Sequence, residues 1–463
     1  MPPTYDTIIV GMGAAGCTAA STLAQAGKRV LALEAMDRVG GRVNTVPFGD
    51  GVVELGAEWI HGQNTSRVYE LAIQNNVSIL PQDLSFDVYR SDGSSGDKDL
   101  LNELVTFSLG VVDDPPEVPE PLGQYITRRL TDYIKTKHPQ LLNDQDFMEN
   151  LFQFLDLIID NYESSNSWND VSTLSRYEEL GGHQHMSWHR NGYKTLFQIL
   201  LNTYQNGPGY PNLEILLNKE VSQITWPQDP AQDVVVTCKD GTTYRARTVI
   251  MTVSLGVLKE RHATLFTPVL PHTKISAIDN LSMGLIGKII LQFPENWWGV
   301  NKSCAGYFIW YPADKKGLKD DWSSQIGAVS TPITADSVMT VWTKGDIGKL
   351  VETLPEDVVK RKVMELIRRF MGKNKTIPEP IAMLRSTWHS NPYTRGSYTY
   401  DNVLTPQFPN ARATLAAPLV DSSGAPRVLF AGEATDSTHF STVHGATDTG
   451  FREANRLLPQ AKL

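Results

Sequence analysis

The sequence predicts an α/β protein of two domains, and its length, composition and first apolar segments support that prediction. The chain has 463 residues, more than a single hydrophobic core usually organises. Its 41% hydrophobic and 20% charged content is typical of a folded globular protein. Two short apolar runs, residues 5–10 and 29–33, flank a glycine-rich turn and an alanine-rich helical stretch over residues 17–27. This strand–helix–strand succession is typical of α/β proteins.

The turn between the first strand and the helix has glycines at a spacing that favours phosphate binding. Gly11, Gly13 and Gly16 form a G-x-G-x-x-G pattern. Gly11 permits a tight turn, Gly13 lets backbone approach a pyrophosphate, and Gly16 lets helix and strand pack closely. Glu34 ends the second strand and is placed to accept hydrogen bonds from a ribose hydroxyl, where a carboxylate disfavours a 2′-phosphate. The segment therefore predicts a dinucleotide site.

The segment that follows, AMDRVGGRVNT, adds a second pair of glycines between two arginines. Paired glycines beside guanidinium groups make a further surface for a pyrophosphate, which suits a long dinucleotide lying extended. At this point the chain resembles the flavin amine oxidase family. Its signature E-x-x-x-R-x-G-G-R is met by Glu34, Arg38, Gly40, Gly41 and Arg42.

The resemblance continues along nearly the whole chain. The segments LGAEWIHG (55–62), ARTVIMTVSLGVL (246–258), WHSNPYTRGSY (388–398) and FAGEATDSTHFSTVHG (430–445) are similar to later signatures of the family. The resemblance implies FAD as cofactor. It places the following residues around FAD: Gly11, Gly13, Ala15, Gly16, Glu34, Ala35, Arg38, Gly40, Gly41, Arg42, Gly56, Ala57, Glu58, Trp59, Val221, Trp388, Tyr393, Gly432, Glu433, Thr442 and Val443.

The order of these motifs implies how the domains are built. A Rossmann-like FAD-binding domain is expected from three separated segments, residues 1–80, 190–282 and 413–463. A substrate-binding domain with a mixed sheet and helices is expected from residues 81–189 and 283–412. The fold class is therefore α/β with an α+β substrate part.

Lys288 and His61 are the candidate catalytic residues. Lys288 lies in the apolar run MGLIGKIILQF, where an unpaired ammonium is costly to bury. The resemblance implies that it holds a water against flavin N5 and assists reoxidation by oxygen. A lysine whose stem packs while its head reaches solvent is the alternative. His61 in WIHG corresponds to a pocket histidine of animal polyamine oxidases.

The resemblance also assigns a substrate cage. Tyr398 falls where the family places an aromatic wall beside the flavin, and an aromatic face suits an alkylamine. Thr442 replaces the second aromatic residue of monoamine oxidases and plant polyamine oxidases, as in animal spermine oxidases. The remaining substrate-binding candidates are Trp59, Glu58 and Glu179. Of the two acids, Glu58 is expected near the flavin, where a carboxylate favours a free ammonium over an acetylated end. A solvated charge is the alternative for both acids.

Ser397 indicates how the cofactor is held. It stands where monoamine oxidases have the cysteine that bonds covalently to the flavin, so FAD is expected to bind non-covalently.

The reaction that the resemblance implies oxidises a secondary amine of spermine, spermidine or an N-acetylated relative to an imine, with O2 reduced to H2O2. A monoamine oxidase-like or lysine-demethylase-like flavoprotein and a catalytically silent FAD-binding scaffold are the alternatives.

Charge and composition limit the classes of molecule that the chain is expected to bind and where it is expected to act. A net charge of −9 argues against nucleic acid and is compatible with a small cationic polyamine. His183, His185 and His189 have no acid or cysteine at zinc-ligand spacing, so no metal site is predicted. No apolar run is long enough to span a membrane. Without a secretory signal we expect an intracellular protein, peroxisomal or cytoplasmic, because the C-terminal Ala-Lys-Leu is similar to a peroxisomal address.

Overall fold

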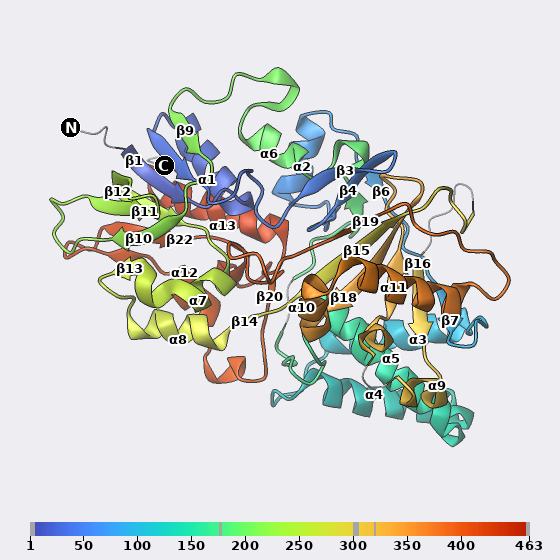
Figure 1. Cartoon of the computed structure of the whole chain (residues 1–463). Helices are drawn as coiled ribbons and strands as arrows, with labels where there is room; N and C mark the ends of the chain where they lie inside the picture. The colour runs from blue at the N-terminus through green and yellow to red at the C-terminus, as the bar shows by residue number, and fades with distance from the viewer. Residues whose placement is uncertain (1–4, 176–177, 300–304, 319–320, 460–463) are drawn as a thin grey trace.

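A nine-stranded sheet forms one half of the computed structural model, which describes residues 5–175, 178–299, 305–318 and 321–459 (Figure 1). The order β13-β10-β11-β12-β1-β2-β9 runs across it, and β22 and β21 continue from β12. Its strands are β1 (Tyr5–Val10), β2 (Val30–Leu33), β9 (Leu213–Leu216), β10 (Val221–Thr225), β11 (Val234–Cys238), β12 (Thr243–Met251), β13 (Phe266–Thr267), β21 (Leu419–Val420) and β22 (Pro426–Phe430).

The central strands of this sheet are parallel and buried on both faces. β1 pairs in parallel with β2 and β12, and β12 pairs in parallel with β22. Ile8 and Val10 face one hydrophobic cluster and Ile9 faces the other. A strand covered on both faces has no polar side, which explains the continuous apolar run. The predicted α/β class is confirmed.

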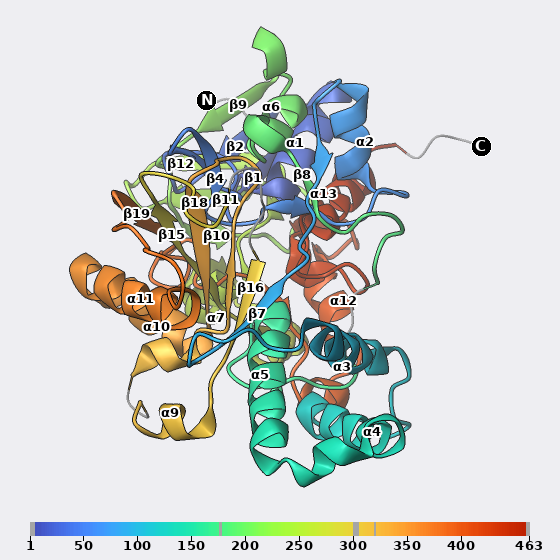
Figure 2. The same ribbon diagram turned by 90° about the vertical axis from the view of Figure 1, so that its right-hand side faces the viewer.

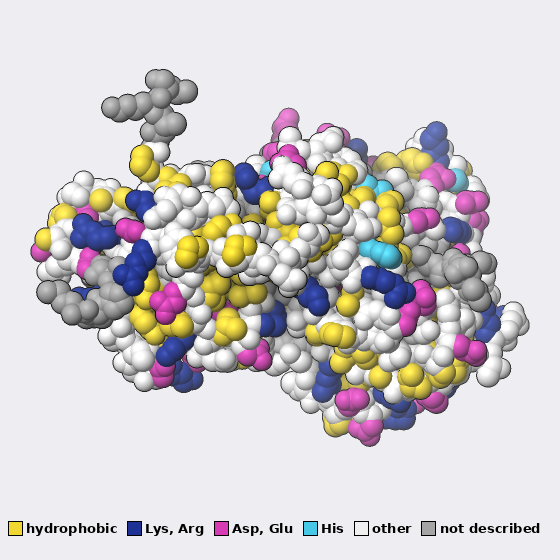
Figure 3. Space-filling view, turned by 90° about the horizontal axis from the view of Figure 1, so that it is seen from above, with side chains coloured by type: hydrophobic (Ala, Val, Ile, Leu, Met, Phe, Trp, Pro, Cys, Tyr) yellow, Lys and Arg dark blue, Asp and Glu magenta, His cyan; other side chains and the backbone are white. Residues whose placement is uncertain are grey.

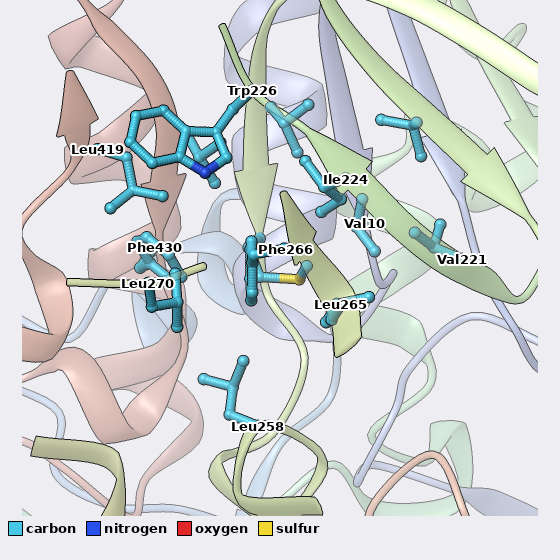
Figure 4. Packing of buried hydrophobic residues seen from close by; sticks show 14 of the residues in the cluster. Val10, Val221, Ile224, Trp226, Leu258, Leu265, Phe266, Leu270, Leu419 and Phe430 are labelled. Carbon is cyan, nitrogen blue, oxygen red and sulfur yellow. The ribbon is translucent and has the colours of Figure 1, made fainter. Parts of the chain in front are cut away.

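One of these clusters fills the space between the sheet and the helices α7 (Leu255–Leu265) and α8 (His272–Asn280). Figure 4 shows Phe266 and Phe430 at its centre, with Trp226 and Leu258 at its edges. The rings of Phe266 and Phe430 lie 6.0 Å apart. This packing joins segments far apart in the sequence into one core.

On the other face, α1 (Ala14–Gln25) packs directly against α13 (Val443–Arg456). A Cβ at Gly450 of α13 would lie 2.2 Å from the Ala15 carbonyl oxygen. The helices can approach this closely because α1 is rich in alanine and α13 has glycine at the contact. The two helices follow β1 and β22, the strands on either side of β12, so both begin near the carboxyl ends of parallel strands, where α/β proteins bind ligands.

A second, mixed sheet of six strands forms the other half, in the order β19-β15-β18-β17-β16-β7. β7 pairs in parallel with β16, and the other pairs are antiparallel. The strands are β7 (Asp87–Arg90), β15 (Ile286–Gln292), β16 (Ala305–Ile309), β17 (Ala328–Ser330), β18 (Val338–Lys344) and β19 (Ala382–Arg385).

Helices cover both faces of the six-stranded sheet (Figure 2). α10 (Gly345–Thr353) and α11 (Glu356–Met371) pack on one face through a cluster that includes Ile289 and Phe370. On the other face are α3 (Lys98–Gly110), α4 (Leu122–Lys137) and α5 (Gln145–Glu163), whose cluster includes Val88 and Leu155. The predicted division into a cofactor domain and a substrate domain stays a prediction.

The remaining helices and strands are short. The remaining helices are α2 (Arg67–Gln74), α6 (Thr195–Leu200), α9 (Pro312–Lys316) and α12 (Ala411–Ala416). Three small sheets are formed by β3 (Thr45–Phe48) with β4 (Gly51–Glu54), by β5 (Trp59–Ile60), β8 (Met186–Ser187) and β6 (Leu80–Pro81), and by β14 (Ser282–Met283) with β20 (Thr399–Tyr400).

Charged side chains of both signs are interspersed on the face shown in Figure 3. None of the helices within the described ranges combines the length and apolar character needed to cross a bilayer. The C-terminal residues 461–463, on which the peroxisomal expectation rests, lie outside the described residues.

Candidate functional site

A cavity of about 1290 Å³ extends from the turn after β1 to the six-stranded sheet. One end is walled by backbone of the two glycine motifs. The other end is walled by aromatic and acidic side chains of α5 and of the second sheet. Single small-molecule pockets measure roughly 300–1,000 Å³. The cavity is therefore large enough for a long cofactor and a substrate side by side.

The first glycine motif has the geometry of a phosphate-binding turn. Gly11 adopts a φ of +95°, which other residues rarely do. A Cβ at Gly16 would lie 2.0 Å from the Gly11 carbonyl oxygen, so only glycine allows helix and turn to meet here. Gly13 precedes α1 and gives it no side-chain cap. The first N–H groups of α1 therefore lack partners within the helix, and they suit an anionic phosphate.

The second glycine motif lies against the first. A Cβ at Gly41 would come within 3.2 Å of the Gly13 Cα, so the two bare backbones are adjacent. Arg38 donates from Nη2 to the Gly41 carbonyl at 2.8 Å and from Nη1 to the Val43 carbonyl at 3.0 Å. Arg38 therefore stabilises the conformation of this turn. Its own side chain does not line the cavity.

Glu34 is buried and is already held by backbone. Its two carboxylate oxygens accept from the N–H groups of Met12 at 2.6 Å and Met36 at 2.9 Å. Burial raises the pKa of Glu34, and these N–H groups oppose the rise. The carboxylate lines the cavity. It thus fixes the turn before α1, a role that the sequence did not indicate, and its contact with a ribose stays a prediction.

Arg42 neutralises a buried acid of the cavity wall, Glu433. Its Nη1 donates to Glu433 Oε1 and to the Ser397 carbonyl, both at 2.8 Å. Burial acts to raise the pKa of Glu433, but Arg42 and Arg412 outweigh it and the pKa lies below its usual value. The acid is therefore a charged, neutralised part of the cavity wall.

The C-terminal signature WHSNPYTRGSY packs on the same cavity. Trp388 donates from its indole N–H to the Leu55 carbonyl at 3.0 Å, and a Cβ at Gly56 would lie 2.9 Å from the Trp388 ring. Tyr393 donates to Glu220 at 3.0 Å. These bonds join segments more than 170 residues apart in the sequence into one wall.

Nearly all of the predicted cofactor residues lie along this cavity. Gly16 and Arg38 are the two that do not line it, and both act on the turns that do. The lining residues are Gly11, Gly13, Ala15, Glu34, Ala35, Gly40, Gly41, Arg42, Gly56, Ala57, Glu58, Trp59, Val221, Trp388, Tyr393, Gly432, Glu433, Thr442 and Val443.

Lys288 lies on β15 of the six-stranded sheet and lines the cavity, with 4% of its surface exposed. Its ammonium donates to the carbonyls of Glu54 at 2.9 Å and Gly56 at 3.0 Å, and to Glu58 Oε2 at 2.7 Å. An ammonium has three N–H donors, and all three are used. The predicted role of Lys288 in holding a water requires that one of these acceptors be given up.

Two tryptophans form an aromatic wall beside Lys288. Trp59 and Trp342 are stacked, with ring centroids 6.0 Å apart, and the Lys288 ammonium lies 4.7 Å from the Trp342 ring. Trp342 is the cross-strand partner of Lys288 between β15 and β18. Sequence reasoning missed Trp342. Strand pairing, which the sequence does not reveal, is what brings it to the site.

His61 is half-buried, and its surroundings favour the neutral imidazole. Its Nδ1 lies 2.7 Å from the Gln184 carbonyl, which can only accept, so Nδ1 bears the hydrogen and Nε2 has a free lone pair. Burial lowers the pKa of His61. Burial, with His61 and His183 nearby, lowers the pKa of His185 to about 4. Within the described ranges, no three His, Cys, Asp or Glu side chains converge as a metal site would require.

The remaining cage residues use their polar atoms on backbone. The Tyr398 hydroxyl shares its one O–H between the Asn161 and Tyr162 carbonyl oxygens, both at 3.1 Å, so its ring is held at the cavity wall. Thr442 caps α13, with its hydroxyl accepting from the Gly445 N–H at 3.0 Å. The Ser397 hydroxyl accepts from the Ile286 N–H at 2.8 Å.

The far end of the cavity is aromatic and acidic. Tyr162 exposes 53% of its surface and lines the cavity, as do Tyr307, Glu163 and Glu179. Burial raises the pKa of Glu163 to about 7, against a hydrogen bond from Ser175. The sequence had indicated Glu179 only. The other three lie in segments without a recognisable motif.

Comparison with known proteins gives one family. A family model described as flavin containing amine oxidoreductase matches residues 14–458. Two similar relatives are named peroxisomal N(1)-acetyl-spermine/spermidine oxidase. The protein from Bos taurus is 31% identical over 98% of this chain and 96% of its own length, and that from Homo sapiens is 31% identical over 97% and 94%. A probable polyamine oxidase 5 of Arabidopsis thaliana is 27% identical over 98% of both chains.

Proposed function

Since this chain belongs to the flavin containing amine oxidoreductase family, we propose that it is an FAD-dependent polyamine oxidase. The observation that carries the proposal is the continuity of the cavity. It leads from two glycine turns suited to a dinucleotide, past Lys288, to aromatic rings and carboxylates suited to an alkylammonium chain. The relatives named as polyamine oxidases support the same substrate class.

The residues present fit an extended dinucleotide. The uncapped start of α1 and the backbone of Gly40 and Gly41 would hold the pyrophosphate, with Arg42 beside it. Glu34 would accept from a ribose hydroxyl. We propose the division into a cofactor domain of residues 1–80, 190–282 and 413–463 and a substrate domain of residues 81–189 and 283–412. The strands of the two main sheets come from these segments.

The flavin would supply the hydride acceptor and return the electrons to O2 as H2O2. The protein would position the amine and keep its nitrogen neutral. Neutral His61 offers its Nε2 lone pair to an amine N–H. The rings of Trp59 and Tyr398 would orient the carbon next to that nitrogen, and the enclosed wall around Lys288 would exclude water. The product imine then reacts with water to an aminoaldehyde and a shorter amine.

The carboxylates at the far end make binding of the substrate's second ammonium depend on pH. Because burial raises the pKa of Glu163 to about 7, this group becomes negative as pH rises through about 7. Alkylammonium groups stay charged until about pH 10. We expect KM for spermidine to fall roughly fivefold between pH 6 and pH 8. A fivefold change corresponds to ~1 kcal/mol of binding free energy. In Glu163→Gln this part of the pH dependence should vanish, and an unchanged profile would rule out the role.

FAD is proposed to bind without a covalent bond. Cys17 and Cys238 are buried and line no part of the cavity, and burial raises the pKa of both thiols, which makes them poor nucleophiles. Cys304 lies outside the described residues. After acid precipitation we expect the yellow colour in the supernatant, with the mass of the precipitated chain unchanged. Colour that remains with the pellet contradicts non-covalent binding.

The activity is tested by peroxide release. The FAD-loaded protein is given spermine, spermidine, N1-acetylated forms and benzylamine in turn. The proposal expects H2O2 with at least one polyamine and far less with benzylamine. Peroxide from benzylamine alone would favour a monoamine oxidase, and none from any amine would favour a binding scaffold.

A peroxisomal location is part of the proposal and rests on the names of the bovine and human relatives.

A further inference from the structure

The ion pair between Lys288 and Glu58 has one movable partner. Two of the three acceptors of the Lys288 ammonium are backbone carbonyls, those of Glu54 at the end of β4 and of Gly56. The third, Glu58 Oε2 at 2.7 Å, belongs to a side chain. A rotation about side-chain bonds releases Glu58 without any change in backbone. Glu58 is therefore the acceptor that can exchange its partner.

Glu58 also faces the space where a ligand would lie. Its carboxylate lines the cavity together with Trp59 and Tyr398. One oxygen is used by Lys288, and within the described ranges the other oxygen, Oε1, accepts no hydrogen bond. A carboxylate has acceptor sites on both oxygens. A second cation in the cavity therefore finds an acceptor in Glu58, in competition with Lys288.

Burial makes this competition strong. The side chains of Lys288 and Glu58 are only 4% and 9% exposed, so water screens their interaction little. While they are paired, the net charge at this point of the wall is zero. A cation bound to Glu58 instead leaves the Lys288 ammonium with two carbonyls and one free N–H, directed toward the same region. The occupancy of the cavity and the charge state of its wall are linked.

We propose that Glu58 is an exchangeable counter-ion. It pairs with Lys288 in the empty cavity and, in the occupied one, with an ammonium of the bound polyamine other than the neutral nitrogen to be oxidised. The proposal rests on the proposed function for its choice of a cationic amine as ligand. In this role Glu58 differs from a member of a permanent ion pair, and it also differs from an acid that binds only the substrate. Lys288 gains a free donor only when an amine is bound.

The test is the affinity for spermidine, measured by calorimetry on the FAD-loaded protein, chemically reduced and free of oxygen so that no turnover occurs. Wild type, Glu58→Gln, Lys288→Met and the double variant are compared. Because Lys288→Met removes the competitor for Glu58, we expect spermidine to bind about tenfold more tightly. Glu58→Gln alone should weaken binding about tenfold. In the Glu58→Gln background, Lys288→Met should change the affinity less than twofold.

Other results overturn the exchange. If Lys288→Met raises the affinity for spermidine equally with and without Glu58, the lysine merely repels cations. If it raises the affinity in neither background, Glu58 does not turn to the ligand. Glu179→Gln is the matched control, since Glu179 lines the cavity but forms no ion pair with Lys288; the gain should persist in that background.

Melting temperatures of all variants check that each is folded, and Lys288→Gln replaces Lys288→Met if the latter is not. Wild-type protein that holds FAD but does not bind spermidine overturns both the substrate class and this inference. Wild-type protein that binds spermidine without the predicted pattern overturns this inference alone. Peroxide release tests the proposed function separately.

Discussion

Gly16→Ala protein is expected to leave purification without bound flavin. The new Cβ would lie 2.0 Å from the Gly11 carbonyl oxygen and 3.0 Å from its carbonyl carbon. Both are backbone atoms, so α1 must move away from the turn. The N–H groups at the start of α1 then no longer converge on a phosphate. Loss of two charge-assisted hydrogen bonds, at about 1.5 kcal/mol or more each, corresponds to at least about a hundredfold weaker binding of FAD.

The measurement is the FAD content of the purified protein and the Kd of the reconstituted one. Gly317→Ala is the matched control, because a Cβ at Gly317 would meet its nearest neighbour, the Asp314 carbonyl oxygen, only at 3.9 Å. This control should retain FAD. A Gly16→Ala protein that binds FAD as tightly as wild type would contradict the assignment of this turn to the phosphates.

Lys288→Met is expected to lower turnover with spermidine about a hundredfold. The ammonium is a charged donor in the cavity wall, next to Trp59 and Trp342, and loss of one such donor from an enclosed site typically costs about 10²–10³ in kcat. Methionine keeps most of the volume of the stem, so the cavity shape should persist. Stopped-flow measurement separates reduction by spermidine from reoxidation by O2, and the resemblance to the family predicts the larger effect on reoxidation.

Lys274→Met is the control for the removal of a buried lysine. Lys274 is 3% exposed and donates to the carbonyls of Thr414, Leu415 and Ala417. It does not line the cavity. This variant should be less stable and yet turn over normally per bound FAD. Equal losses of turnover in the two variants would show that Lys288 acts through the stability of the fold alone.

Local sequence patterns were sufficient for the parts of the site that lie next to one another in the chain. The strand, turn and helix over this segment could be predicted because backbone geometry imposes glycine at Gly11 and Gly16. Lys288 could be placed on a buried strand because its neighbours are apolar. In each case the physical demand falls on a few consecutive residues.

The parts that come from packing could not be predicted. Trp342 reaches Lys288 only through the register between β15 and β18, and Tyr162 and Glu163 arrive at the end of α5. Nothing local marks these residues as different from core residues. The pairing of Glu58 with Lys288 is a contact over 230 residues. The sequence alone left both side chains without a partner, and the proposed exchange depends on that partner.

The most direct test of the central claim is whether a polyamine reduces the bound flavin. Oxygen-free, FAD-loaded protein is mixed with one equivalent of spermidine or spermine, and the visible absorbance of the flavin is followed. We predict full bleaching with a polyamine, return of the colour on admission of air, and release of one H2O2 per flavin. Flavin that stays yellow with every polyamine, in protein that binds FAD normally, would contradict the account.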